Sequence, residues 1–555
     1  MQKEGFNKYK QYQNVEIKER KWPNRLIEKA PIWCSVDLRD GNQSLRNPMS
    51  LEKKMEFFNL LIKMGYKEIE IGFPAASQIE YDFTRYLIEN NLIPEDVTIQ
   101  ILTQARRELI EKSFEALKGA KRAVVHLYNS TSVAQRKVVF NMSKKEIIDL
   151  AIEGTRIIKE LVPKYPETKF TLEYSPESFS GTELDFALEI CEAVVEEWQP
   201  SADNKVILNL PTTVEMYTPN VYADQIEWFS DNIKNRENII LSAHPHNDRG
   251  TAVATAELAM LAGIDRVEGT IFGNGERTGN VDLVTLGLNL FTQGIDPEID
   301  FSDIDSIIKV YEECTEMVVP DRQPYAGSLV YTAYSGSHQD AIKKGLSAYT
   351  EGEYWEVPYL PIDPKDVGRN YEAIIRINAQ SGKGGIAFIM QNYYGYSIPK
   401  FMQKDFSKVI QEIADESAKE VNQEIIFGAF KDSYLNITSP IALESIEINS
   451  KEISKKDIEI KAEIDYNGEI INISGIGNGP IDAFVHGLNK VVKGFKVVSY
   501  NQHSLGNDSD AESVAYIQVA DEKGENFYGV GTDSNIILAS IKAVISAVNK
   551  GIKEQ

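Results

Sequence analysis

Cysteine is scarce in this chain of 555 residues, which contains only Cys34, Cys191 and Cys314. Three scattered cysteines are too few for a disulfide framework or a cysteine-rich zinc site, so we expect each one to be a small buried hydrophobic residue. A run of about 18 apolar residues, as a membrane span requires, is absent from the sequence. The segment from Met1 to Arg25 lacks the apolar stretch of a secretory signal. These absences predict a cytoplasmic protein that does not enter a membrane.

Positive charge is also in deficit. The 59 lysines and arginines are outnumbered by 83 acidic residues, which gives a formal net charge of -24. This balance argues against nucleic acid or an anionic membrane as the main partner. A small anionic substrate stays compatible with it, because a site needs only local positive charge or a metal ion. The length exceeds what one hydrophobic core usually supports, so we expect two or three domains.

Short apolar segments alternate with longer amphipathic ones through the first 300 residues. Strict strand–helix alternation implies parallel strands, and eight such units match a closed (β/α)8 TIM barrel. A doubly wound open sheet is the alternative, disfavoured because no glycine fingerprint follows the first strand. The predicted strands cover residues 32–38, 68–73, 97–103, 122–128, 169–174, 205–210, 238–243 and 266–272.

Beyond the barrel, the sequence pattern changes at about residue 301 and again at about residue 431. We expect an N-terminal extension over residues 1–30, the barrel over 31–300, linker subdomains over 301–430 and a C-terminal α+β regulatory domain over 431–555. The last segment contains an internal β-β-α repeat, with the pairs Gly475 and Gly477, then Gly529 and Gly531, each placed at a turn before an apolar helix. These glycines either make tight turns only, or let the carboxylate of a free amino acid approach the helix N-terminus.

Two of the six histidines form the sharpest chemical signal in the sequence. His244 and His246 end the seventh predicted strand, where residues two apart point the same way and can converge on one ion. Asp40, after the first strand, and Asn280, after the eighth, could supply oxygen ligands. The alternative for Asp40 is a turn or helix cap. Imidazole ligation alone favours Zn²⁺ or Mn²⁺ over Mg²⁺.

Three segments carry a specific resemblance: residues 37–43 (DLRDGNQ), 244–250 (HPHNDRG) and 273–280 (GNGERTGN). With them the chain resembles the 2-isopropylmalate synthase family, which is related to homocitrate synthases. The resemblance implies that Asp40, His244, His246 and Asn280 bind a divalent ion, usually Mg²⁺ or Mn²⁺, with Zn²⁺ as the alternative. The other residues that it implies are Arg39, Glu177, His338 and Tyr371 for catalysis, and Gln43, Leu102, His126, Tyr128, Ser175, Asn209 and Thr213 for substrate binding.

The resemblance also implies an activity. Family members are acyltransferases that join acetyl-CoA to 3-methyl-2-oxobutanoate in a Claisen condensation and release CoA, as the first committed step of leucine biosynthesis. It implies a homodimer in which His338 and Tyr371 enter the partner's site, and leucine as a feedback inhibitor. Homocitrate synthase, citramalate synthase and an acyl-CoA lyase are the enzymatic alternatives. A catalytically silent amino-acid sensor is the alternative from another class.

Overall fold

The computed structural model describes residues 14–333, 335–369, 383–417, 421, 423–449, 458–505 and 511–554. The chain divides into two compact units. Unit 1 comprises Met1–Val330 and Pro364–Arg369, and unit 2 comprises Tyr331–Asp363 and Asn370–Gln555. Among the helices of the described segments, none has the length and apolar character needed to cross a membrane. The three cysteines are buried and free, as predicted.

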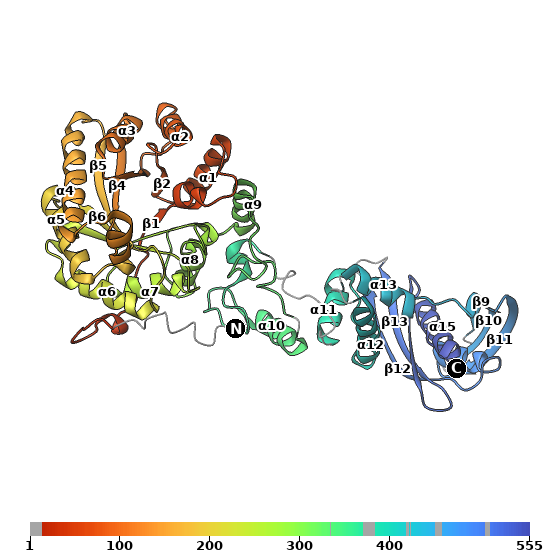
Figure 1. Cartoon of the computed structure of the whole chain (residues 1–555). Helices are drawn as coiled ribbons and strands as arrows, with labels where there is room; N and C mark the ends of the chain where they lie inside the picture. Colours follow the sequence, from red (N-terminus) through yellow and green to blue (C-terminus); the bar gives the residue numbers. More distant parts are fainter. Residues whose placement is uncertain are drawn as a thin grey trace. The chain divides into compact units, whose positions relative to one another are not determined.

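Unit 1 is a closed barrel of eight parallel strands that neighbour one another in chain order (Figure 1). The barrel closes where the first strand pairs with the eighth, from Ile32 opposite Arg266 to Ser35 opposite Gly269. The predicted (β/α)8 fold is therefore confirmed. The strands are β1 Ile32–Ser35, β2 Glu68–Gly72, β3 Thr98–Gln104, β4 Arg122–Ser130, β5 Lys169–Glu177, β6 Val206–Thr212, β7 Ile239–Pro245 and β8 Arg266–Gly269.

Helices surround the barrel, and most of them present one apolar stripe to it, whereas α7 is apolar nearly all round. Serine side chains begin several of them: Ser50, Ser77 and Ser143 each accept a hydrogen bond from a backbone N–H of the first turn. The helices of unit 1 are α1 Leu51–Met64, α2 Gln78–Glu89, α3 Arg107–Leu117, α4 Lys144–Leu161, α5 Leu184–Trp198, α6 Pro219–Asn232, α7 Ala252–Ala262, α8 Leu283–Phe291 and α9 Ile304–Thr315.

Two strands end three residues earlier than the sequence predicted. β1 ends at Ser35 rather than at residue 38, and β8 ends at Gly269 rather than at residue 272. After β1 the chain enters a single π-helical turn, Asp37–Gly41, in which the Gly41 N–H donates to the Val36 carbonyl at 3.2 Å. Turns of this kind are rare and cluster at functional sites. Here the turn carries Arg39 and Asp40 over the carboxyl end of the barrel.

The described residues of unit 2 form four helices followed by two similar sheet-and-helix modules. Each module is a three-stranded antiparallel sheet with one helix, so the predicted repeat is present with one strand more than expected. Buried residues of both sheets and both helices share one apolar core. The elements are α10 Gly336–Ala348, α11 Lys383–Tyr394, α12 Lys400–Ser417, α13 Gln423–Tyr434, β9 Ile441–Asn449, β10 Ile458–Tyr466, β11 Glu469–Gly477, α14 Pro480–Leu488, β12 Lys496–Leu505, β13 Glu512–Ala520, β14 Asn526–Asp533 and α15 Ile536–Glu554.

The repeated glycines lie inside strands, so their predicted position at turns was wrong. Gly475 and Gly477 belong to β11, and Gly529 and Gly531 belong to β14. A Cβ added at Gly475 would lie 2.0 Å from a backbone oxygen of α14, and one added at Gly531 would lie 2.1 Å from a backbone oxygen of α15. Each strand therefore needs glycine because the helix backbone packs directly against it.

Candidate metal centre and active site

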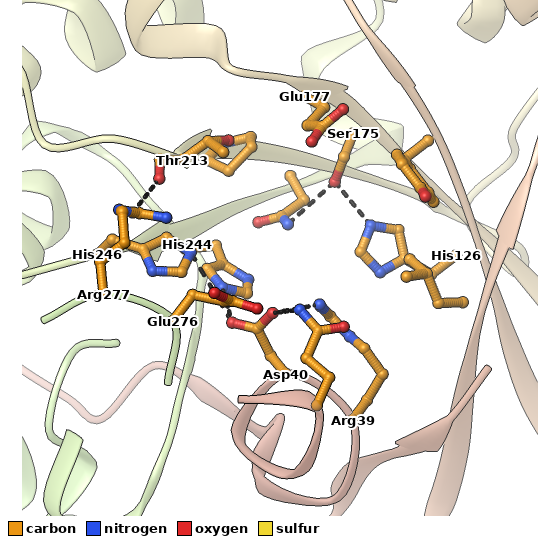
Figure 2. A pocket seen from close by; sticks show the side chains of 15 residues that line it. Arg39, Asp40, His126, Ser175, Glu177, Thr213, His244, His246, Glu276 and Arg277 are labelled. Atoms are coloured by element: carbon orange, nitrogen blue, oxygen red, sulfur yellow. Dashed lines mark hydrogen bonds and ion pairs between the residues drawn. The ribbon is translucent and has the colours of Figure 1, made fainter. Parts of the chain in front are cut away.

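A cavity of about 250 Å³ opens at the carboxyl end of the barrel strands, the face on which active sites of this fold lie. In Figure 2, Asp40, His244 and His246 lie at one side of this cavity, and His126 and Ser175 lie at the other. Its size suits a small metabolite. The cavity is lined by Arg39, Asp40, Gln43, Leu102, His126, Tyr128, Ser175, Glu177, Asn209, Pro211, Thr213, His244, His246, Glu276 and Arg277.

Three potential metal ligands converge at one side of this cavity. The Nε2 atoms of His244 and His246 lie 3.5 and 3.8 Å from the same oxygen, Oδ2 of Asp40. The two imidazole rings are stacked, with centroids 5.2 Å apart. Asn280 joins them because the segment after β8 pairs with the end of β7, and its Oδ1 lies 2.8 Å from Nε2 of His244. The structure thus brings together all four residues that the sequence singled out for metal binding.

An unpaired carboxylate oxygen in this group fits a divalent cation. Oδ2 of Asp40, which faces Nε2 of both imidazoles, has no hydrogen-bond partner although Asp40 is buried. Leaving such a polar atom unpaired is unfavourable unless something binds it. Two imidazoles, a carboxylate and an amide oxygen form a donor set that suits a divalent metal with open positions. The geometry therefore favours metal binding over the alternative that Asp40 only caps a turn.

The charges of this group are strongly coupled. Burial disfavours the Asp40 anion, yet Arg39 and the two imidazoles outweigh burial and hold the pKa of that carboxyl well below its usual range. Burial also disfavours a charged His244, but Asp40 and Glu268 raise its pKa to about 10. Burial and the neighbouring charge of His244 lower the pKa of His246 to about 4. The pKa values of the two imidazoles therefore shift in opposite directions, because only His244 contacts two carboxylates.

Arg39 is held rigidly at the cavity wall. Its Nε lies 2.6 Å from Oε2 of Glu70, and its Nη1 lies 2.6 Å from Oδ1 of Asp40. Gln43 donates to the same Asp40 oxygen at 2.9 Å. The guanidinium is therefore fixed by two carboxylates at a place where it can meet negative charge on a ligand.

The other side of the cavity is a chain of hydrogen-bonded polar groups. Nε2 of His126 lies 2.7 Å from the Ser175 hydroxyl, and its Nδ1 lies 2.9 Å from Glu70. The Ser175 hydroxyl also accepts from the Asn209 amide at 3.1 Å. One carboxylate oxygen of Glu177 accepts a hydrogen bond from the Ser130 hydroxyl. Of the remaining predicted substrate residues, Leu102, Tyr128 and Thr213 also line the cavity.

Below this cavity lies a layer of charged residues inside the barrel. His126, Glu173 and Glu268 form a second group whose ligand atoms lie within 4.8 Å of one another. The guanidinium of Arg266 lies 2.8 Å from Glu268 and 3.4 Å from Glu173, and it supplies the positive charge that a cation would bring. Burial and the charge of Glu268 raise the pKa of Glu173 well above its usual range. The positive charge beside this second group is therefore that of an arginine, while both carboxylate oxygens of Glu173 have no hydrogen-bond partner.

Some predicted residues lie outside the cavity. His338 is an exposed residue of α10 in unit 2, where its ring stacks on Tyr359 at a centroid distance of 4.0 Å. Tyr371 lies outside the described residues. The four glycines of the repeat belong to the C-terminal modules.

Several residues of the site were not predicted from the sequence. Glu276 and Arg277 line the cavity, and Arg277 pairs with Asp248 at 2.7 Å. Glu70 and Glu268 support the cavity from below through Arg39, His126 and His244. Their signal in the sequence was a pair of charged residues two positions apart in a predicted strand, Glu68 and Glu70 in β2 and Arg266 and Glu268 in β8.

Comparison with known proteins assigns the chain segment by segment. An HMGL-like family profile matches residues 30–310, and a profile described as "Alpha-isopropylmalate synthase, post-catalytic domain-like" matches residues 328–391. A profile described as "LeuA allosteric (dimerisation) domain" matches residues 420–552. Among solved structures, an HMG-CoA lyase from Bacillus subtilis covers 53% of this chain and 96% of its own, with 19% identity and a TM-score of 0.43. The assignment therefore rests on the sequence matches.

Two relatives named 2-isopropylmalate synthase align along the entire chain. The protein from Acetoanaerobium sticklandii is 56% identical over 553 residues, which cover 99% of this chain and 98% of the relative. The protein from Clostridium acetobutylicum is 55% identical over 553 residues, with 98% and 99% coverage. With this identity over its full length, and with the catalytic, post-catalytic and allosteric segments in the same order, the chain belongs to the 2-isopropylmalate synthase family.

Proposed function

We propose that this protein catalyses the metal-dependent Claisen condensation of acetyl-CoA with 3-methyl-2-oxobutanoate, releasing 2-isopropylmalate and CoA. This reaction would be the first committed step of leucine biosynthesis. The observation that carries the proposal is the convergence of Asp40, His244 and His246 beside a metabolite-sized cavity. The full-length relatives named for this activity support it.

The divalent ion in this proposal is Mg²⁺ or Mn²⁺, with Zn²⁺ as the alternative that the two imidazoles suggest. Asp40, His244, His246 and Asn280 would hold it. Such an ion supplies Lewis-acid polarisation of the keto group of the oxo acid. The unpaired Oδ2 of Asp40 supports a bound cation without distinguishing between these metals.

The residues of the chain would then act on protons and charge. A base takes a methyl proton from acetyl-CoA, and the resulting enolate carbon bonds to C2 of the oxo acid. The former keto oxygen gains negative charge, which the fixed guanidinium of Arg39 is placed to stabilise. Water then cleaves the thioester and CoA leaves as the free thiol. Candidates for the base are Glu177, His338 and a water that they hold.

The charges of the cavity favour an uncharged side chain on the oxo acid. A second carboxylate on the substrate, as in the homocitrate reaction, would need a free cation. Among the described residues that line the cavity, Arg39 is paired with Asp40 and Glu70, and Arg277 is paired with Asp248. These pairings support 3-methyl-2-oxobutanoate over a dicarboxylic oxo acid.

Regulation and assembly complete the proposal. The allosteric (dimerisation) segment at residues 420–552 supports a homodimer and feedback inhibition by leucine. We place His338 and Tyr371 in the active site of the partner subunit, and the leucine site in the C-terminal modules that contain Gly475, Gly477, Gly529 and Gly531. Isothermal titration of leucine into the full-length protein tests the regulatory part, which fails if no heat of binding appears.

The catalytic proposal is tested by free-thiol release from acetyl-CoA with a panel of oxo acids. We expect 3-methyl-2-oxobutanoate to be used with the highest kcat/KM, ahead of pyruvate and 2-oxoglutarate, and only when divalent metal is present. A preference for 2-oxoglutarate would indicate a homocitrate synthase, and a preference for pyruvate a citramalate synthase. No thiol release with any oxo acid would favour the silent sensor.

A further inference from the structure

Glu268 of β8 is a fully buried carboxylate that accepts hydrogen bonds from four side chains. Its Oε2 lies 2.7 Å from Nδ1 of His244 and accepts from Nδ2 of Asn209 at 3.0 Å. Its Oε1 accepts from Nε2 of Gln100 at 2.9 Å and from Nη1 of Arg266 at 2.8 Å. These four donors use the full accepting capacity of a carboxylate.

This arrangement determines which nitrogen of His244 faces the metal group. An ionised carboxylate only accepts hydrogen bonds, so the Nδ1 atom that faces Glu268 must carry its proton. Nε2 is then the nitrogen left for an ion, and it is the atom that faces Asp40 and Asn280, at 3.5 and 2.8 Å. A carboxylate behind a metal-binding imidazole fixes the ring orientation and strengthens it as a ligand.

The same carboxylate determines how the Asn209 amide is turned. The amide nitrogen donates to Glu268 and to the Ser175 hydroxyl at 3.1 Å, so both of its hydrogens are used. The amide oxygen of Asn209 has no partner although the residue is only 1% exposed, and Asn209 lines the cavity. Glu268 therefore leaves this oxygen as an acceptor for a ligand.

We infer that Glu268 is a positioning residue that orients a metal ligand and a substrate-pocket amide at the same time. The inference rests on the proposed function, because it assumes that His244 binds a divalent ion. The inference predicts that the affinity for the metal ion and the affinity for the oxo acid both depend on one buried carboxylate, which itself contacts neither the ion nor the oxo acid. A single residue of β8 would thereby determine the orientation of Asn209 on β6 and of His244 on β7.

The test is Glu268→Gln in the full-length protein, with Mn²⁺ binding to metal-stripped protein measured from the electron paramagnetic resonance signal of free Mn²⁺. A glutamine keeps the shape but has one accepting oxygen, so its NH₂ group must oppose two of the four donors. We expect the Mn²⁺ Kd to rise about 10- to 100-fold. We also expect the KM for the oxo acid to rise when Mn²⁺ is saturating.

Glu173→Gln is the matched control. Glu173 is equally buried and also lies beside Arg266, at 3.4 Å, but no hydrogen bond or ion pair of the described structure joins it to the four metal-binding residues. We expect its Mn²⁺ Kd to stay within about threefold of the wild type, since the ligands keep their support. An equal loss in both variants would show a general effect of charge in the barrel interior and would overturn the inference.

Glu268→Asp keeps the inference testable if the glutamine variant does not fold. The shorter aspartate keeps a negative charge near Arg266 but cannot reach all four donors. A positioning role predicts weakened Mn²⁺ binding in this variant, whereas a role of the charge alone predicts wild-type binding and would overturn the inference. Absence of Mn²⁺ binding to the wild type would instead refute the proposed function.

Discussion

Replacing Gly531 with alanine should destabilise unit 2 without disturbing the barrel. The added Cβ would lie 2.1 Å from the carbonyl oxygen of Ala539 and 2.5 Å from the backbone nitrogen of Ala543. Both atoms belong to the backbone of α15, so no side-chain rotation relieves the overlap and the helix must move away from β14. The same helix contributes many residues to the core of the two modules.

The expected loss in the free energy of unfolding of Gly531→Ala follows from the cost of adding a methyl group to a well-packed core. Extra methyl groups in well-packed interiors cost about 1–3 kcal/mol, and contacts with rigid backbone lie at the upper end or beyond. For a unit of this size, each kcal/mol lowers the melting temperature by about 2–4 °C. The assay is calorimetric unfolding of the full-length protein, with hydrogen exchange of peptides from β14 and α15 as the local measurement.

Gly428→Ala provides a control that should raise, rather than lower, the free energy of unfolding. Gly428 lies in α13, and a Cβ added there meets no atom within 4 Å. Alanine in a helix interior stabilises by about 0.5–1 kcal/mol relative to glycine. If the Gly531 variant keeps the melting temperature and exchange protection of the wild type, the packing explanation is wrong. A loss of leucine binding in a destabilised Gly531 variant would not identify a leucine contact.

Three further predictions concern the barrel and the assembly. His244→Ala and His246→Ala should each weaken Mn²⁺ binding by at least about tenfold and abolish CoA release with an unchanged circular dichroism spectrum, and full activity of the metal-free double variant would contradict this. Mixing inactive His338→Ala with inactive Glu177→Ala under subunit exchange should restore part of the activity, and no recovery despite demonstrated exchange would place both residues in one subunit's site. Arg266→Met leaves buried carboxylates without a counter-charge and should lower the free energy of unfolding by about 3–5 kcal/mol in urea titrations; a change below about 1 kcal/mol would refute the role of that charge.

The barrel and the metal ligands could be predicted because their signals are local and repeated. Eight apolar segments of strand length gave the fold, and the spacing of His244 and His246 on one strand gave the metal pair. Barrel closure then placed Asp40 near them, because β1 pairs with β8. Asn280 was a candidate because it follows the eighth strand, but the pairing between its segment and the end of β7, which brings it to His244, could not be predicted.

Other features could not be predicted, for physical reasons. The π-helical turn at Asp37–Gly41 depends on backbone hydrogen bonds, from Gly41 to Val36 and from Asn42 to Asp37, which leave no residue pattern. The repeated glycines indicated close approach to something, but the sequence could not tell a helix backbone from a ligand. Glu70 and Glu268 lie on strands far apart in the chain, and Gln100 of β3 donates to both carboxylates only once the barrel has closed. Their roles follow from tertiary contacts.

The most direct test of the central claim uses acetyl-CoA labelled with ¹³C at both acetyl carbons, together with 3-methyl-2-oxobutanoate and the full-length protein. The product is analysed by mass spectrometry after metal removal and again after Mn²⁺ or Mg²⁺ is restored. We predict 2-isopropylmalate that carries both labelled carbons, formed with an equal amount of free CoA, and only in the presence of metal. Free CoA with labelled acetate and no new carbon–carbon bond, or an equal yield in metal-free protein, would contradict the account.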